Sequence, residues 1–123
     1  MVTNSEVTKV RNVLKKAKQV LLDNKWTKGA LAKKANGHTV CEPNDSQATC
    51  FCAMGAVCSV LNVDGLSEPT TLEQRVYDVL VFAVNSVSEC YDVPEFNDSP
   101  ATTKQDVLDI FDYAISNTKS LLS

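Results

Sequence analysis

The sequence contains no long hydrophobic run and no segment of the kind that directs export. Its longest apolar stretch is well short of the eighteen or more residues that a membrane-spanning helix needs. Its N-terminus lacks the basic segment followed by an apolar core that an export signal requires. Internal repeats and low-complexity segments are missing as well. We therefore expect a cytoplasmic protein with no membrane partner.

The overall composition is that of an ordinary globular protein. Of the 123 residues, 44% are hydrophobic and 22% are charged. A chain of this length can bury a core without disulfides or a structural metal, so we expect a single domain over residues 1–123.

The charges are unevenly distributed along the chain. Residues 1–40 contain nine Lys and Arg against two Asp and Glu, a net charge of +7, whereas residues 41–123 contain three against thirteen, a net charge of −10. The two parts should attract each other. The simplest interpretation is a basic N-terminal helix that faces acidic C-terminal helices, within one molecule or between copies. The alternative is a phosphate-binding face on the basic part.

The segment at about residues 49–62 is apolar on every side apart from Ser59. A helix without a polar face belongs inside a domain, so we predict a buried central helix here. Gly55 costs about 1 kcal/mol relative to Ala in a helix, which indicates that another backbone passes close to it.

The predicted fold class is mainly α: a compact bundle of about four helices around the central helix. Ser5 or Thr3 can cap a first helix that runs to about Asp23. The capping sequences Thr70-Thr71-Leu72-Glu73 and Thr102-Thr103-Lys104-Gln105 predict the third and fourth helices. The Asn36-Gly37 pair predicts a type I′ turn in a small β-hairpin at about residues 30–41, between the first two helices. We expect the residues from about 91 to 100 to form a loop and the chain to fray after Asn117.

Two charged rows form the candidate interaction surface. Arg11, Lys15 and Lys18 recur at helical spacing on the outer side of the first helix. Because this helix carries no aromatic residue, we do not expect the row to bind nucleic acid. Asp109 and Asp112 face outward on the last predicted helix. A protein partner or a second copy of the chain would contact these rows.

An Asn-Asp pair next to an aromatic residue is the candidate ligand site. We expect Trp26 to fill the seam between the first helix and the hairpin, with its indole N–H bonded to a carbonyl. The pair itself either caps the last helix and ties its loop down, or presents an amide and a carboxylate to a ligand. Any pocket should lie where this loop meets the start of the central helix, whose free N–H groups can hold a small anion. The candidate ligand-binding residues are Trp26, Lys28, Phe96, Asn97 and Asp98.

The cysteines are five in number and are expected to be free thiols that fill the core. Cys52 at a helix N-terminus is a conceivable nucleophile with His38 as its base, but no third group is evident to orient the imidazole. His38, Cys41, Cys50 and Cys52 are zinc-ligand types, although Cys-x-Cys is not the usual zinc-knuckle spacing. We therefore predict no catalytic residue, no metal and no cofactor.

Three short motifs occur in a recognisable order. They are Lys25-Trp26-Thr27-Lys28-Gly29-Ala30 with the later Asn36-Gly37, then Cys52-Ala53-Met54-Gly55-Ala56, then Phe96-Asn97-Asp98-Ser99-Pro100 followed by Val107-Leu108 and Ala114. The chain thereby resembles a family of small uncharacterised bacterial and bacteriophage proteins with Gly-Trp, Cys-x-x-Gly-Ala and Trp-Asn-Asp motifs, a domain of unknown function. It differs from that pattern at Lys25, where the family tends to have Gly, and at Phe96, where it tends to have Trp.

The resemblance implies an accessory protein of a bacterium or a bacteriophage, in the latter case in the host cytoplasm. Our leading functional hypothesis is a non-catalytic binding or interaction protein. The first alternative is a protein that binds or sequesters a small ligand such as a nucleotide or a phosphorylated metabolite. The second is a cysteine-dependent enzyme or a zinc-binding module.

Overall fold

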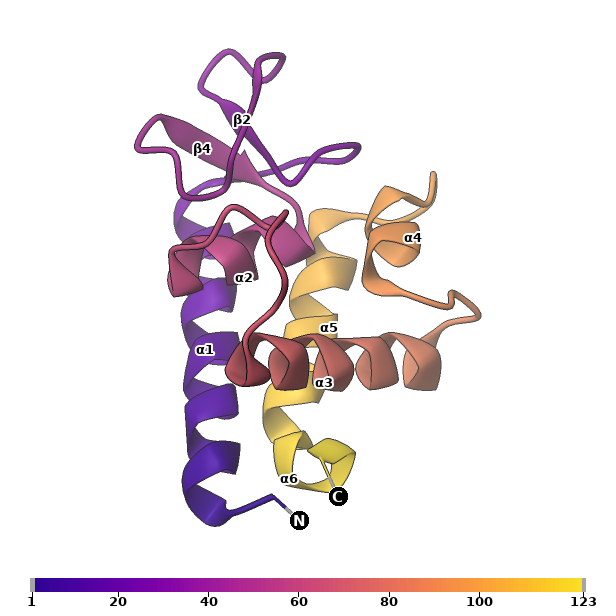
Figure 1. The fold of residues 1–123 in the computed structure, drawn as a ribbon. Coiled ribbons are helices and arrows are strands. Elements are labelled where there is room, and N and C mark those ends of the chain that lie inside the picture. Colours follow the sequence, from indigo (N-terminus) through magenta and orange to yellow (C-terminus); the bar gives the residue numbers. More distant parts are fainter. Residues whose placement is uncertain (1, 123) are drawn as a thin grey trace.

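The computed structural model describes residues 2–122, most of which are helical (Figure 1). The helices and strands follow one another as α1 (Asn4–Asp23), β1 (Lys25–Trp26), β2 (Ala32–Lys34), β3 (Val40–Cys41), β4 (Ala48–Phe51), α2 (Ala53–Leu61), α3 (Thr71–Val87), α4 (Val93–Asp98), α5 (Lys104–Ser116) and α6 (Thr118–Leu122). The mainly α class is confirmed. The described residues form six helices, however, and not the four or so that the sequence predicted.

The long helices begin where the capping sequences predict. Thr3 caps α1 in a capping box with Glu6, and Thr103 caps α5 in a capping box with Asp106. Thr70 caps α3 through its side chain. Each of these side chains accepts a hydrogen bond from a backbone N–H that the first helical turn leaves unpaired.

The predicted central helix is wrong at its start. Residues 48–51 form strand β4, and α2 begins only after Cys52. β4 lies between β1 and β2 in the sheet, where both neighbours satisfy its backbone groups. An apolar run with no polar face fits a buried strand as well as a buried helix, and periodicity alone does not separate the two. The remaining helix is buried over much of its length, at Ala53, Gly55, Ala56, Val57 and Cys58.

The hairpin is confirmed as part of a four-stranded sheet with the order β1-β4-β2-β3. β2 and β3 pair antiparallel, and β1 pairs parallel to β4. The turn is not type I′, because Gly37 has a positive φ of 76° but Asn36 does not. The Asn36 side chain instead accepts hydrogen bonds from the backbone N–H groups of His38 and Thr39, both at 2.9 Å.

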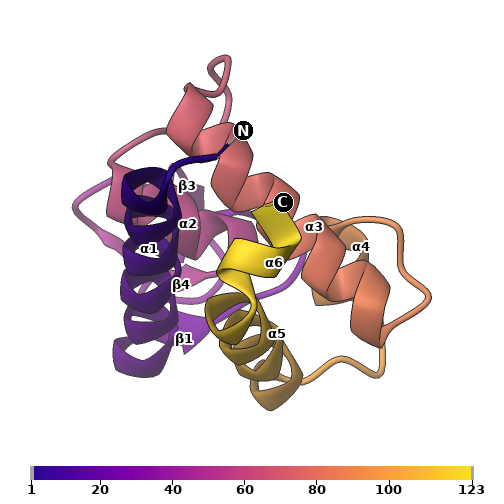
Figure 2. The ribbon, with the colours of Figure 1, turned by 90° about the horizontal axis from the view of Figure 1, so that it is seen from below.

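The helices pack around α5 and α1, which lie side by side with α3 crossing them (Figures 1 and 2). The sheet lies at the C-terminal end of α1, and α4 lies near the start of α2 (Figure 1). The largest fully buried side chains include Leu14, Leu21, Leu80 and Phe111. These four come from α1, α3 and α5, so one apolar core joins the three longest helices.

Two short helices replace segments that were expected to be irregular. α4 lies within the predicted loop at residues 91–100, with Asp92 as its N-cap and Pro94 in its first turn. α6 follows Asn117, where fraying was predicted. Its first residue, Thr118, is fully buried and donates a hydrogen bond to the Ala114 carbonyl at 2.7 Å. Across residues 2–122, none of the helices combines the length and apolar character of a membrane span.

Candidate functional site

Asn97 joins three segments that are far apart in the sequence. Its Oδ1 accepts hydrogen bonds from Trp26 Nε1 at 2.7 Å and from the Ala53 backbone N–H at 3.0 Å. Its Nδ2 donates to the Thr27 carbonyl at 3.1 Å and to Asp98 Oδ1 at 3.0 Å. The side chain is 1% exposed. One amide therefore connects the end of β1, the start of α2 and the end of α4.

Lys28 extends this connection along α4. Its Nζ donates to the Ser99 carbonyl at 2.6 Å and lies 5.3 Å from the centre of the Trp26 ring. The residues Trp26, Lys28, Asn97 and Asp98 are thus brought together, as expected. Phe96 belongs to the same helix but lines a different cavity. Asn97 ties the α4 segment down, whereas the cap of α5 is Thr103.

A small cavity opens beside this cluster, where the sequence placed a pocket. It measures about 210 Å³ and is lined by residues 29–31, by Cys52 and Met54, and by Pro94, Asn97 and Asp98. We call it the Asp98 cavity. The Asp98 carboxylate is fixed at its edge, because Oδ1 accepts a hydrogen bond from the Gly29 backbone N–H at 3.0 Å.

The start of α2 offers little to an anion. The Ala53 N–H is bonded to Asn97, and the Gly55 N–H donates to Cys52 Sγ at 3.3 Å. Burial raises the pKa of the Cys52 thiol to about 11, despite the hydrogen bonds from Gly55 and Met54 that lower it. Desolvation therefore outweighs the helix N-terminus, and the thiol is protonated at neutral pH.

A larger groove lies on the other side of α4, between the end of α3 and α5. It measures about 400 Å³ and is lined by Val87, Phe96, Asp106, Asp109, Ile110 and Tyr113. We call it the acidic groove. Ile110 is buried, whereas the Val87 side chain is 51% exposed at the edge. The groove thus combines apolar walls with two carboxylates, which no motif in the sequence had indicated.

Two further cavities also contain carboxylates. One of about 370 Å³ includes Leu31, Val40 and Leu66 with Glu42 and Asp64. Another, of about 350 Å³, is lined by polar and acidic residues that include Asp64, Glu68 and Glu73. The described residues that line these four cavities include carboxylates in every case and no Lys or Arg.

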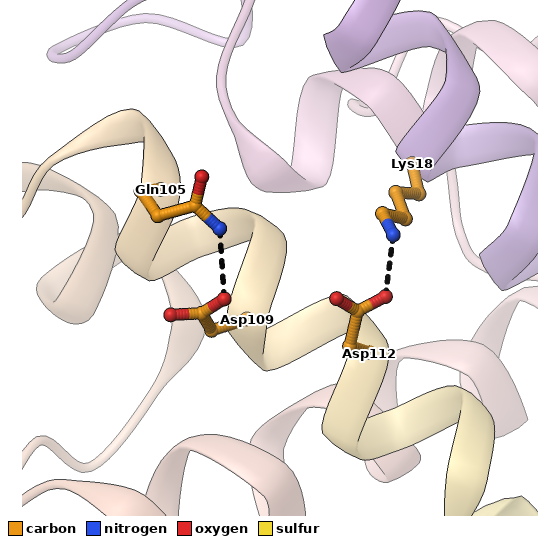
Figure 3. Close-up of polar contacts among 4 residues, drawn as sticks. All are labelled: Lys18, Gln105, Asp109 and Asp112. Atoms are coloured by element: carbon orange, nitrogen blue, oxygen red, sulfur yellow. Dashed lines mark hydrogen bonds and ion pairs between the residues drawn. The ribbon is translucent and has the colours of Figure 1, made fainter.

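The predicted charged rows meet within one molecule. Lys18 of α1 forms an ion pair with Asp112 of α5 at 2.6 Å (Figure 3). Arg11 donates from Nε to the Ile115 carbonyl at 3.4 Å. Lys15 is exposed. Asp109 lies one turn from Asp112 and accepts a hydrogen bond from Gln105 at 2.9 Å (Figure 3).

A partly buried polar chain links α2 to α3. The Cys58 thiol lies 3.4 Å from the Tyr77 hydroxyl, which donates to Glu73 Oε2 at 2.8 Å. Burial raises the pKa of the Tyr77 hydroxyl, and it also raises the pKa of the Cys58 thiol. Glu73 is only 4% exposed. In the sequence Glu73 had only the appearance of a capping residue, and nothing pointed to this chain.

The zinc-ligand candidates do not form a cluster. All five cysteines are free thiols, and His38 is exposed in the hairpin turn. In residues 2–122, no three His, Cys, Asp or Glu side chains are grouped as a metal ion would require.

Comparison with known proteins identifies the family. A family of unknown function, DUF6197, matches residues 5–117, and the chain belongs to that family. The match runs from the first turn of α1 to the residue after α5. No curated protein and no solved structure matches the chain.

Proposed function

We propose that this protein is a non-catalytic interaction protein that binds a cationic amphipathic segment of a partner protein in the acidic groove. The observation that carries the proposal is the combination of Phe96, Ile110 and Tyr113 with the carboxylates of Asp106 and Asp109 in one groove of about 400 Å³. A groove of this size is within the range of ligand clefts. It suits an amphipathic helix with apolar side chains on one face and Lys or Arg beside them.

Charge complementarity favours such a partner over an anionic one. Residues 41–123 carry a net charge of −10, and this part of the chain provides all the residues of the groove. Opposite charges at the rim of an interface raise the association rate and exclude like-charged competitors. The Asp109 carboxylate has no partner in residues 2–122 other than the neutral amide of Gln105, so it is available to a cation.

The non-catalytic part of the proposal rests on how the reactive groups are used. The Cys52 thiol caps α2 and keeps its proton at neutral pH, because its pKa is raised to about 11. The Asn97 amide makes hydrogen bonds through both its oxygen and its nitrogen. We infer an accessory role in the cytoplasm of a bacterium, or of the host of a bacteriophage, from the resemblance of the three sequence motifs.

The test measures binding of a synthetic 18-residue amphipathic Lys/Leu helix. The peptide carries a dye, and the fluorescence anisotropy of the dye reports binding. Val87→Lys, at an exposed position of the groove wall, should abolish binding. Asp109→Asn should weaken it several-fold and reduce its salt dependence. Asp112→Asn is the matched control, because it makes the same change one turn away on α5 but outside the groove. A scrambled peptide of the same composition controls for charge alone.

Two results would contradict the proposal. One is equal binding of the scrambled peptide, and the other is unchanged affinity in Val87→Lys. Sedimentation at low and high salt tests whether a second copy of the chain occupies the groove. A dimer that dissociates in Val87→Lys would mean that the groove binds another copy and not a partner protein. Nucleotides and phosphorylated metabolites should not raise the melting temperature, because the described residues that line these four cavities include no Lys or Arg.

A further inference from the structure

The Asp98 cavity lies on the opposite side of α4 from the acidic groove. Phe96 lines the groove, whereas Pro94 and Asp98 line the cavity. With a volume of about 210 Å³, the cavity is smaller than a typical cleft for a small-molecule ligand. It is large enough for one long side chain or a molecule of that size.

Hydrogen bonds fix the walls of this cavity before any ligand arrives. Asp98 Oδ1 accepts from the Gly29 N–H at 3.0 Å and from Asn97 Nδ2 at 3.0 Å. The Leu31 carbonyl accepts from the Cys52 N–H at 3.1 Å, which holds the opposite wall against the start of α2. A site with rigid walls loses little entropy when it binds.

Asp98 is the only charged side chain among the described residues that line the cavity. Lys28 lies nearby, but its Nζ donates to the carbonyls of Ser99 at 2.6 Å and Pro100 at 3.5 Å. Asp98 forms no ion pair within residues 2–122. Its side chain is exposed, and Oδ1 carries both of its hydrogen bonds, so Oδ2 can accept from a ligand.

We propose that the Asp98 cavity binds an alkylguanidinium or alkylammonium group, with the cationic head on the Asp98 carboxylate and the alkyl stem against Leu31, Met54 and Pro94. The apolar lining selects for a stem, and a single carboxylate is too few oxygen ligands for Ca²⁺ or Mg²⁺. Either head group can donate a charge-assisted hydrogen bond to Oδ2, the oxygen that the Gly29 and Asn97 bonds leave free. The source is either a free organic cation or an Arg or Lys side chain of a partner.

Nuclear magnetic resonance titration with n-butylguanidinium tests this proposal on the full chain. Two N–H signals report on this site: the Gly29 amide, which is bonded to Asp98, and the indole of Trp26, the only tryptophan, which is bonded to Asn97. Both signals should shift with one saturable curve. Asp98→Asn keeps an Oδ1 acceptor for Gly29 but removes the charge, and it should weaken binding about tenfold or more. Glu89→Gln removes a charge at an exposed position outside the cavity and should leave binding unchanged.

A series of probes keeps the test valid even if Asp98→Asn perturbs the fold. On the natural chain, each methylene removed from the stem should weaken binding by about fourfold, and n-butyrate should not bind. Binding of N-acetyl-arginine methylamide with similar affinity would favour a partner side chain, and its exclusion would favour a free cation. The absence of a saturable shift, equal binding of butyrate, or no dependence on stem length overturns the proposal. These results do not depend on the acidic groove, because the Gly29 and Trp26 signals belong to the Asp98 cavity and its hydrogen-bond network, and neither residue lines the groove.

Discussion

The Asn97 amide matches its surroundings atom for atom. The indole N–H of Trp26 and the backbone N–H of Ala53 both need an acceptor, and the Thr27 carbonyl needs a donor. An amide side chain supplies both from one position, which neither a carboxylate nor a hydroxyl can do in the same geometry. A buried network in which every member is satisfied also rigidifies its neighbours.

Replacing Asn97 with Ala should therefore destabilise the protein strongly. The change leaves the Trp26 indole, the Ala53 N–H and the Thr27 carbonyl without this partner, and each buried polar group left unpaired costs about 1–3 kcal/mol. We expect the free energy of unfolding to fall by about 3–5 kcal/mol. Urea unfolding, monitored by circular dichroism, measures this free energy. In the variant, the fluorescence emission of Trp26 should shift to longer wavelength.

Asn12→Ala, at an exposed position of α1, is the matched control and should change the free energy of unfolding by less than about 0.5 kcal/mol. A similar small effect for Asn97→Ala would mean that the Asn97 hydrogen bonds do not hold the three segments together.

From the sequence we assigned Trp26 and Asn97 to one site, but we could not predict the hydrogen bond between them. An aromatic residue and an Asn-Asp pair next to turn formers indicate an ordered loop at each place. The hydrogen bond between them spans 71 positions of the chain. No local pattern carries that pairing, because it depends on how β1, α2 and α4 pack. The Cys58–Tyr77–Glu73 chain could not be predicted for the same reason.

At the scale of elements, Gly55 is where the backbone of one segment meets another. The sequence predicted a close backbone approach, and this is confirmed: a Cβ at Gly55 would lie 1.8 Å from the Leu31 carbonyl oxygen and 2.7 Å from its carbon. The segment before β2 therefore crosses directly over α2. The same Leu31 carbonyl accepts the Cys52 N–H, so it cannot move away without breaking that bond.

Gly55→Ala should cost more than about 3 kcal/mol of unfolding free energy or prevent folding, although Ala normally stabilises a helix by about 1 kcal/mol relative to Gly. Thermal unfolding of the variant measures the loss. Ser59→Ala on the same helix is the control and should be neutral or slightly stabilising. If both variants were equally stable, Leu31 would not lie against Gly55.

Element boundaries were harder to predict than element types. Capping residues act locally, and for that reason the starts of α1, α3 and α5 were predictable. Residues 48–51 form a strand because β1 and β2 lie on either side of them, which is a tertiary effect on a sequence that also suits a helix. α4 and α6 are short helices that depend on packing, and turn formers are frequent near them. The sequence therefore predicted a loop and a frayed end in their place.

At the scale of the whole molecule, the uneven charge is only partly neutralised within the fold. The Lys18–Asp112 ion pair joins the basic and acidic parts, as one of the two interpretations expected. Its side chains are 29% and 53% exposed, so it contributes little to stability. Seven of the other carboxylates line the four cavities, and this excess is the basis of the cationic partner that we propose.

The stability of the whole protein should decline in alkaline solution, because the folded chain retains protons that the unfolded chain releases. Burial raises the pKa of Cys52 from 9.0 to about 11. Below pH 9 both states hold this proton, and stability is unaffected. Between pH 9 and about 11 only the folded state holds it, so the free energy of unfolding falls by about 1.4 kcal/mol per pH unit, or roughly 2–3 kcal/mol in total.

Cys52→Ser isolates this effect, because a serine hydroxyl does not titrate in this range and remains a good cap for α2. Urea unfolding under reducing conditions at pH 8 and pH 11 should show a decline that is about 2–3 kcal/mol smaller in Cys52→Ser than in the natural chain. Cys90→Ser, at a half-buried position away from α2, should keep the full decline. An equal decline in the natural chain and in Cys52→Ser would mean that the thiol ionises as readily in the folded state as in the unfolded state. In that case Cys52 would be reactive, and the case against catalysis would lose its main support.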